Sequence, residues 1–226
     1  MGGSALFFYC ASMSIAATLI PFVFNPANPM SAPLQRHRWR LYGAGLLLSA
    51  SAGVWAQVPF NGTYTQDFDT LAASGAGLAW ANNSTLPGWF LFNKNLASIT
   101  SYVAGNGASN TGSFYSLGLS ADRALGGVAS GGAYFGSPAQ GAVAGWIALA
   151  VRNDTGGSVD GITLRFNGEQ WRNGGNTERQ PMVLEYGMGA TFADVPEWLP
   201  AGANFNWQSP VATGTAAAVD LSLIHI

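Results

Sequence analysis

The sequence predicts an all-β domain made of two packed sheets. Short runs in which apolar and polar residues alternate recur along the chain, and turns rich in Gly, Asn and Ser separate them. No long amphipathic pattern with helical spacing interrupts this series, although residues 72–81 could hold one helical turn. Many short strands joined by polar turns are typical of a β-sandwich.

The expected strands follow one another from Tyr64 to Met188. Residues 142–151 are apolar throughout and predict a central strand that is covered on both sides. The clearest alternation is in the last two segments, 162–167 and 182–188. The other expected strands are residues 64–69, 89–92, 97–103, 113–117 and 123–125. From this order we expect a concanavalin-like jelly roll.

Residues 161–188 predict a hairpin with a β-bulge at or next to Gly168. The apolar residues of its two strands match only if the first strand contains one extra residue, and glycine tolerates the bulge conformation. The resulting register places Glu169 and Trp171 on the apolar face. A carboxylate there needs a partner, so we expect Glu169 to be hydrogen-bonded to Arg172, Arg179 or a backbone amide.

An export signal lies inside the chain rather than at its start. Met30 opens a segment with a basic stretch at 36–40, an apolar run at 41–54 and the small-x-small sequence Val-Trp-Ala that ends at Ala56. We expect signal peptidase to cut after Ala56, which makes residues 30–56 the signal peptide and residues 57–220 the working domain. The product would be secreted or displayed at the cell surface, with no membrane association after the signal is removed.

Both ends of the chain are predicted to lie outside this domain. Residues 1–29 are apolar and interrupted by prolines, and they precede a complete signal peptide with its own methionine. We interpret them as an incorrectly assigned start; a transmembrane anchor is the alternative. Residues 221–226 can be back-translated into a transposase recognition sequence used in building sequencing libraries. They are interpreted as adapter, and the natural reading frame is expected to continue past Asp220.

The composition of residues 57–220 argues against several classes of function. Six basic residues stand against eleven acidic ones, and a net charge of about −5 opposes binding to nucleic-acid phosphates. Both histidines (His37 and His225) and Cys10 lie outside this segment. Ser-His-Asp and Cys-His arrangements are therefore excluded within it, as are zinc sites built from His and Cys. We expect no catalytic residues, no metal site and no cofactor.

A pair of carboxylates could still hydrolyse a glycosidic bond. Glu169 together with Glu185 or Asp194 is the pair that such an enzyme would use. Concanavalin-like glycosidases carry closely spaced acids on one strand, however, whereas Glu169 is followed by Gln-Trp-Arg with no second acid. This difference argues against hydrolysis by the segment.

Asp67 and Asp69 are the candidates for calcium binding. They lie two residues apart, so that both could face one way along a strand and offer oxygen ligands. Gly and further Asp ligands at loop spacing are missing nearby. A solvated strand edge is therefore the favoured interpretation.

One tryptophan stands out as a candidate ligand contact. Trp89 and Trp146 lie in apolar runs and are expected in the core, whereas Trp171 has Glu169 and Arg172 as near neighbours. An indole has an apolar face that can pack on a sugar ring, while adjacent polar groups bond the hydroxyls. Glu169, Trp171 and Arg172 are the predicted ligand-binding residues, and extracellular polysaccharide or other envelope components are the predicted partners.

Several blocks of the sequence resemble an N-terminal β-sandwich module of secreted bacterial proteins. The most specific block is Gly-Glu-Gln-Trp-Arg-Asn-Gly-Gly at 168–175, and the similarity covers most of residues 62–220. Proteins with this module often end in a PEP-CTERM-type sorting tail, and related modules precede extracellular nuclease or adhesin-like regions. The resemblance implies a fold and an exported location, without assigning an activity. The other blocks are residues 66–71, 83–89, 122–126 and 135–138.

Together these observations predict a secreted, non-catalytic β-sandwich module of a larger cell-surface or extracellular-matrix protein, with glycan as the ligand class. Two alternatives stay open. One is a carbohydrate-processing enzyme that uses carboxylates, and the other is the accessory domain of an extracellular nuclease whose catalytic part lies downstream. The sequence encoded after Asp220 would separate them, because a sorting tail and a metallonuclease domain are easily told apart.

Overall fold

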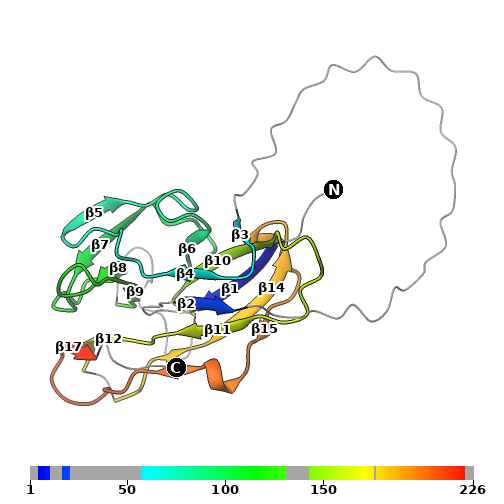
Figure 1. Ribbon diagram of the computed structural model, residues 1–226. Helices are drawn as coiled ribbons and strands as arrows, with labels where there is room; N and C mark the ends of the chain where they lie inside the picture. The colour runs from blue at the N-terminus through cyan, green and yellow to red at the C-terminus, as the bar shows by residue number, and fades with distance from the viewer. Residues whose placement is uncertain (1–4, 11–16, 21–56, 131–142, 176, 222–226) are drawn as a thin grey trace, which may run out of the picture.

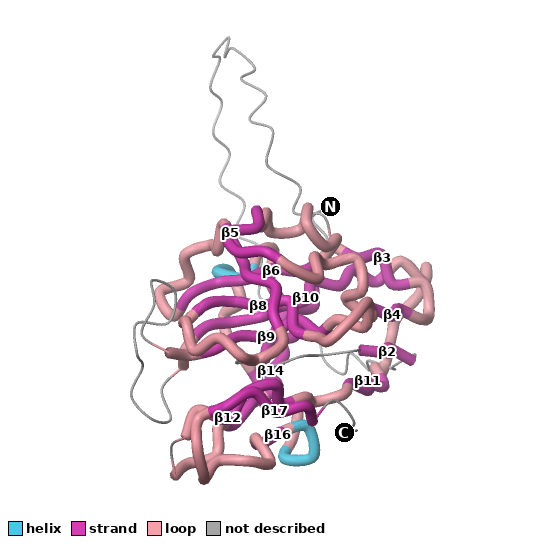
Figure 2. Tube along the Cα trace, turned by 90° about the vertical axis from the view of Figure 1, so that its left-hand side faces the viewer, coloured by secondary structure: helices cyan, strands magenta, loops and turns pink. Residues whose placement is uncertain are grey.

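The computed structural model describes residues 5–10, 17–20, 57–130, 143–175 and 177–221, which form strands joined by loops (Figure 1). The helical elements among these residues are two 3-10 turns, η1 (Phe192–Asp194) and η2 (Ala203–Phe205) (Figure 2). The predicted all-β class is confirmed. Residues 72–81, which were considered for a helical turn, contain strand β5 (Gly75–Ala79).

The largest sheet has six strands, and β10 (Gly145–Asn153) lies at its centre. One edge of β10 pairs antiparallel with β1, and the other edge pairs antiparallel with β6 and parallel with β3. This position agrees with the central strand expected from the apolar run at 142–151. The remaining strands of the sheet are β1 (Ala5–Cys10), β3 (Val58–Phe60), β6 (Trp89–Asn93), β14 (Leu184–Gly189) and β15 (Leu199–Pro200).

Four smaller sheets complete the described fold. The four-stranded sheet has the order β5, β7 (Ser101–Gly105), β8 (Ser113–Leu117) and β9 (Ala124–Val128), with β7 and β8 parallel. The three-stranded sheet has the order β11 (Thr163–Phe166), β2 (Ala17–Ile20) and β4 (Tyr64–Gln66). The two pairs are β12 (Gln170–Asn173) with β17 (Ala217–Leu221), and β13 (Pro181–Met182) with β16 (Trp207–Gln208).

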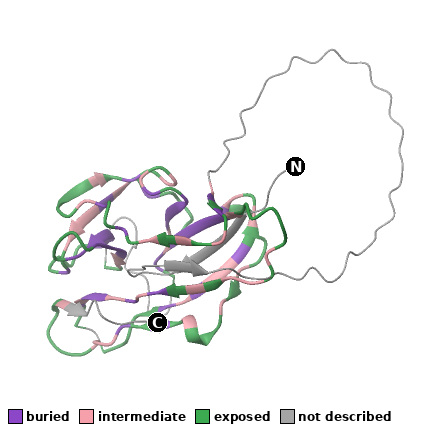
Figure 3. Ribbon diagram, in the orientation of Figure 1, coloured by how far each residue is buried: buried purple, intermediate pink, exposed green. Residues whose placement is uncertain are grey.

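One main core joins the large sheet to three of the four smaller sheets. Because side chains alternate along a strand, Ile147, Leu149 and Val151 of β10 all enter this core from one face of the large sheet. Phe114 and Leu125 enter it from the four-stranded sheet. Figure 3 shows the buried stretches along β10 and β8. The main core therefore packs the six-stranded sheet against the four-stranded and three-stranded sheets and the β13–β16 pair.

The opposite face of the large sheet carries a second cluster, which we call the outer aromatic cluster. It consists of Phe90, Phe92, Ala148, Ala150 and Phe192, with Trp146, Val195 and Trp198 packed against it. In β6 and β10 the residues of this cluster alternate with those of the main core. The large sheet is thus apolar on both faces, as the unbroken apolar sequence of β10 requires.

The predicted hairpin over residues 161–188 is wrong. Its first segment pairs through β11 with β2 and through β12 with β17, whereas β14 pairs with β1 and β15. The ladder is interrupted at Gly168, and the register shift in β12 falls between Gln170 and Arg172. A Cβ at Gly168 would overlap the Trp207 indole. Glycine is therefore required here for close packing on Trp207, and not for a bulge in a hairpin.

Strands β1 and β2 come from residues 1–29, the segment that sequence analysis places outside the working domain. They pair with strands on the other side of the predicted cut after Ala56. Residues 30–56, 135–138 and 222–226, which carry the export signal, one resemblance block and most of the suspected adapter, lie outside the described residues. The cut, the start and the adapter stay predictions. A search of the described residues for a helix able to cross a membrane finds none.

Candidate functional site

Trp171, the predicted ligand contact, lies in β12 and is buried. Its exposed fraction is 6 %, and it packs with Tyr115, Leu117 and Ala124 of strands β8 and β9. The expectation that Trp171 borders an open surface is wrong. Its polar neighbours in the sequence bond to the indole itself or to other parts of the chain, so they do not indicate that the indole meets solvent.

Glu169 acts as the acceptor for the indole of Trp171. The Nε1 of Trp171 donates a hydrogen bond to Oε2 of Glu169 at 2.8 Å, which alternation along the strand permits because the two residues share one side. A buried indole N–H without an acceptor costs about 1–3 kcal/mol. The half-buried carboxylate of Glu169 therefore stabilises the buried position of Trp171.

Sequence analysis offers Arg172, Arg179 or a backbone amide as the partner of Glu169; the two arginines donate to backbone carbonyls elsewhere. Nη1 of Arg172 donates to the carbonyl oxygens of Gly107 and Ala108 at 3.0 and 2.9 Å. Nη1 of Arg179 donates to the carbonyl oxygen of Ser209 at 3.0 Å. These hydrogen bonds of Arg172 therefore hold the loop that follows β7 against β12.

Gly107 explains why that loop can approach so closely. Its φ is +85°, and a Cβ there would overlap the backbone carbonyl of Trp171. Only glycine combines this left-handed conformation with such a short approach. The loop and β12 are in direct backbone contact at this point.

Two further residues of the block, Gln170 and Asn173, were not singled out by sequence reasoning. Gln170 exchanges two hydrogen bonds with the backbone of Val211, through Nε2 at 2.7 Å and Oε1 at 2.9 Å. Nδ2 of Asn173 donates to the carbonyl of Thr213 at 2.9 Å. Both amides are buried. A carboxamide offers one donor group and one acceptor, so Gln170 pairs with Val211 as a neighbouring strand would.

The block at residues 168–175 is therefore a junction inside the fold. It connects the loop after β7, the β8–β9 pair and the segment around 211–215. Within the junction the side chains of Glu169, Trp171 and Arg172 are already bound to protein groups. All three side chains thus have partners within the fold, and their role as ligand-binding residues stays a prediction.

Arg123 is another buried polar residue that the sequence did not reveal. It is 4 % exposed, and its guanidinium donates to Ser116 Oγ at 2.9 Å and to the Ser116 and Gly105 carbonyls at 2.6 and 3.2 Å. Burial lowers the pKa of Arg123, while the charges of Tyr102, Asp122 and Asp69 act in the opposite direction. These contacts hold the chain turn between β8 and β9.

Asp67 and Asp69 are exposed and follow the end of β4. Oδ1 of Asp67 accepts the backbone N–H of Asp69 at 3.1 Å, and Oδ1 of Asp69 accepts the backbone N–H of Arg123 at 2.9 Å. These are local turn and loop contacts, with the two residues in a loop and not on a strand. Among the described residues no group of three or more His, Cys, Asp or Glu side chains gathers in a way that could hold a metal ion.

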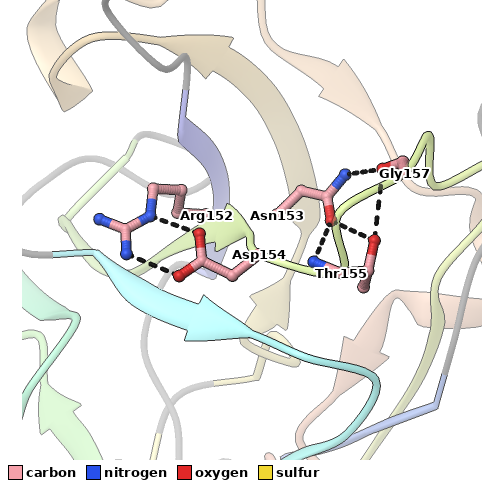
Figure 4. A network of polar contacts seen from close by, with 5 residues as sticks. All are labelled: Arg152, Asn153, Asp154, Thr155 and Gly157. Atoms are coloured by element: carbon pink, nitrogen blue, oxygen red, sulfur yellow. Dashed lines mark hydrogen bonds and ion pairs between the residues drawn. The ribbon is translucent and has the colours of Figure 1, made fainter.

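The turn after β10 contains a compact polar network (Figure 4). Arg152 donates two hydrogen bonds of 2.7 Å to the carboxylate of Asp154, which raises the pKa of Arg152 and lowers that of Asp154. Asn153 accepts from Thr155 and donates to the carbonyl of Gly157 at 2.7 Å. Each group bonds within the turn, so this network closes the turn and offers no evident ligand site.

The outer aromatic cluster is the other place where aromatic side chains gather. Phe192 of η1 packs on Phe92, with ring centroids 4.6 Å apart, and on Trp198 at 4.8 Å. Its edge contact with Trp146 is 6.2 Å. Trp146 and Trp198 are only half-buried, in contrast to Trp89, whose exposed fraction is 2 %. The expectation that Trp89 and Trp146 are both core residues is confirmed for Trp89 alone.

The segment that bears Trp198 lies directly on β14. A Cβ at Gly187 would overlap Val195 and come within 3.4 Å of the Trp198 ring. The small side chains of Ala148 and Ala150 on β10 belong to the same face. The position of Trp198 therefore depends on two features. The sheet carries small residues at this face, and the aromatic rings of the outer aromatic cluster pack on them.

The carboxylates considered for hydrolysis belong to different elements. Glu169 precedes β12, Glu185 lies in β14 and Asp194 ends η1. Oδ2 of Asp194 accepts the hydroxyl of Thr191 at 2.8 Å. Glu169 bonds the indole of Trp171, so the acid proposed for that chemistry has a structural partner.

No protein-family model matches the chain, and neither a curated protein nor a solved structure matches it. The fold and the site define an all-β domain with an internal polar junction and an aromatic cluster on one sheet face. A function must be inferred from this geometry.

Proposed function

We propose that the chain is a non-catalytic β-sandwich module of the jelly-roll type in a larger exported protein, and that it binds extracellular polysaccharide or another envelope glycan. The contact surface in this proposal is the outer aromatic cluster, with Trp146 and Trp198 as the residues that meet the sugar. This assignment moves the site from β12 to the outer face of the six-stranded sheet.

The shared main core supports the sandwich arrangement. Apolar residues from one face of the large sheet meet those of the four-stranded and three-stranded sheets in a single cluster. Two layers of sheet with one core between them are the arrangement that a β-sandwich needs. The proposal further states that the strands follow one another through the two layers in the order of a jelly roll.

One observation carries the binding part of the proposal: Trp146 and Trp198 are half-buried on either side of Phe192. A partly exposed indole offers a rigid, flat apolar surface that packs on the C–H face of a pyranose, and little conformational entropy is lost on binding. Trp171 lacks such a surface because β8 and β9 cover it. The outer cluster is therefore the better sugar contact.

Residues 57–220 contain neither histidine nor cysteine. Cys10, which β1 brings into the large sheet, has no histidine among the described residues that could act as its base, and this composition supports a non-catalytic role. The signal-like segment that ends at Ala56 supports export, and the resemblance to secreted bacterial modules agrees with a place in a larger surface protein.

Affinity gel electrophoresis against a panel of neutral and acidic polysaccharides tests the proposal. The protein should migrate more slowly in gels that contain its ligand, and Trp146→Ala and Trp198→Ala should each abolish most of the retardation. Leu119→Ala is the matched control, because Leu119 is a large apolar residue that is 67 % exposed and belongs to the loop after β8. Thermal melting followed by circular dichroism shows whether each variant is folded.

Two results would contradict the proposal. One is a wild-type protein that no polysaccharide in the panel retards. The other is unchanged retardation of folded Trp146→Ala and Trp198→Ala variants, since the sugar would then contact another surface.

A further inference from the structure

Strand β1 is an inner strand of the large sheet and lies between β10 and β14. It pairs antiparallel with β10 from Leu6 opposite Val151 to Cys10 opposite Ile147. It also pairs antiparallel with β14 from Ala5 opposite Gly189 to Cys10 opposite Leu184. Figure 1 shows β1 between β10 and β14. Both edges of β1 are thus paired from Leu6 to Cys10.

The connection between β14 and the rest of the sheet depends on this strand. The other partner of β14 is β15, whose pairing covers only Glu185 with Pro200 and Tyr186 with Leu199. Neighbouring strands are about 4.8 Å apart, so a sheet without β1 has a gap of roughly 10 Å between β10 and β14. The exposed fractions of Ala148 and Ala150 in β10 are 0 %, and unpaired backbone groups at such a buried position are costly.

We propose that the gap between β10 and β14 is a strand-acceptor site whose occupant is Ala5–Cys10 of the same chain. The site takes one extended, uncharged, proline-free segment that runs antiparallel to both of its neighbours. The occupant has the sequence Ala-Leu-Phe-Phe-Tyr-Cys, rich in the aromatic residues that favour strands. Backbone hydrogen bonds on both edges hold it, as in other cases of strand addition.

The site makes the upstream segment a noncovalent part of the domain. Strand β2 of the same segment pairs with β11 and β4, so residues 5–20 contact the remainder at two places. Two linked contacts hold a segment more firmly than either alone. A cut made within residues 21–56 of the folded full chain should therefore leave a complex of two pieces. This inference is independent of the proposed glycan binding.

The test uses the full chain with a specific protease site inserted after Pro33. After digestion, size-exclusion chromatography under native conditions is followed by mass spectrometry of the main peak. We expect the upstream peptide to elute with the domain in equimolar amount and to separate from it only in denaturant.

Phe8→Pro provides the matched variant, because a proline in a strand with two neighbours removes a ladder hydrogen bond. We expect at least about a tenfold loss of retained peptide, as 1.4 kcal/mol corresponds to tenfold in affinity. Gly3→Pro, outside β1, should retain the peptide. A Phe8→Pro chain that loses its near-ultraviolet circular dichroism before digestion, while Gly3→Pro keeps it, also supports the proposal.

Three outcomes would overturn it. The wild-type peptide could separate after the cut and leave a folded monomer. Phe8→Pro could retain its peptide as well as the wild type does. The cut domain could also lose the peptide and associate with itself, which would make a second copy the source of the added strand.

Discussion

Trp146 and Trp171 contrast in a way that the sequence around them does not suggest. Trp171 has polar neighbours and is 6 % exposed, whereas Trp146 lies in an apolar run and is only half-buried. The cover that each receives explains the difference. Strands β8 and β9 pack on Trp171, but the face that bears Trp146 is covered by the short segment around η1. The exposure of a tryptophan side chain therefore depends on the elements that pack on its face of the sheet. It cannot be inferred from the residues next to it in the sequence.

The contrast also separates two kinds of polar surroundings. Around Trp171 the polar groups bind one another and nearby backbone, so they complete the fold. Beside Trp198, Glu197 is exposed, and Asp194 is exposed although its Oδ2 accepts the hydroxyl of Thr191. A polar residue beside a tryptophan indicates a binding site only if its own hydrogen-bonding groups are not already used within the protein.

The largest expected effect is that of removing Trp171. We predict that Trp171→Ala lowers the free energy of unfolding by about 3–5 kcal/mol, because a large aromatic side chain leaves a cavity between β12 and β8. Trp146→Ala should cost about half as much, since Trp146 is partly exposed. Urea unfolding followed by far-ultraviolet circular dichroism measures both. Equal losses for the two variants would show that their burial does not differ as described.

A smaller effect is expected at the contact between the β7 loop and β12. Gly107 and Gly156 have similar φ angles, +85° and +79°, but a Cβ at Gly107 would overlap the Trp171 carbonyl whereas nothing lies within 4 Å of one at Gly156. Both alanine variants should lose about 1–2 kcal/mol from the left-handed conformation.

Gly107→Ala should lose additional stability because the loop must move away from β12. The difference in urea midpoint between the two variants isolates this contribution. If the midpoints coincide, the loop does not pack against Trp171 closely enough to matter.

The smallest effect distinguishes a structural role of Glu169 from a role in ligand binding. Glu169→Gln keeps an oxygen acceptor for the Trp171 indole, so we expect a change in stability of less than about 1 kcal/mol. Glu169→Ala removes the acceptor and should cost about 1–3 kcal/mol.

Neither Glu169 variant should change the retardation by polysaccharide, measured for each variant against its own migration in a gel without polysaccharide, because the lost charge alters the absolute migration. A Glu169→Gln variant that keeps its stability but loses retardation would return the sugar contact to β12.

Local elements were largely predictable from the sequence. Residues 113–117 form the expected strand, and residues 89–92 and 142–151 lie close to the observed bounds of β6 and β10. The burial of Trp89 also follows from its apolar neighbours. These features depend on the alternation and hydrophobicity of a few adjacent residues, which the sequence contains in full.

Strand pairing was less predictable. The segments 162–167 and 182–188 have matching apolar patterns and adjacent positions, but their strands bind β2 and β1 instead of each other. Many pairings in the large sheet join residues more than fifty positions apart. Apolar alternation indicates that a strand has a buried face, but it does not identify the strand with which it pairs.

The sequence by itself determined the all-β class, the absence of histidine and cysteine from residues 57–220, and the position of several strands. Tertiary structure alone decided that Trp171 is buried, that Gly107 and Gly168 are contact points, and that aromatic residues from β6, β10 and η1 form one cluster. The physical reason is the range of the interactions. Hydrophobic periodicity acts between neighbours along the chain, whereas burial of a side chain depends on elements that come from distant parts of it.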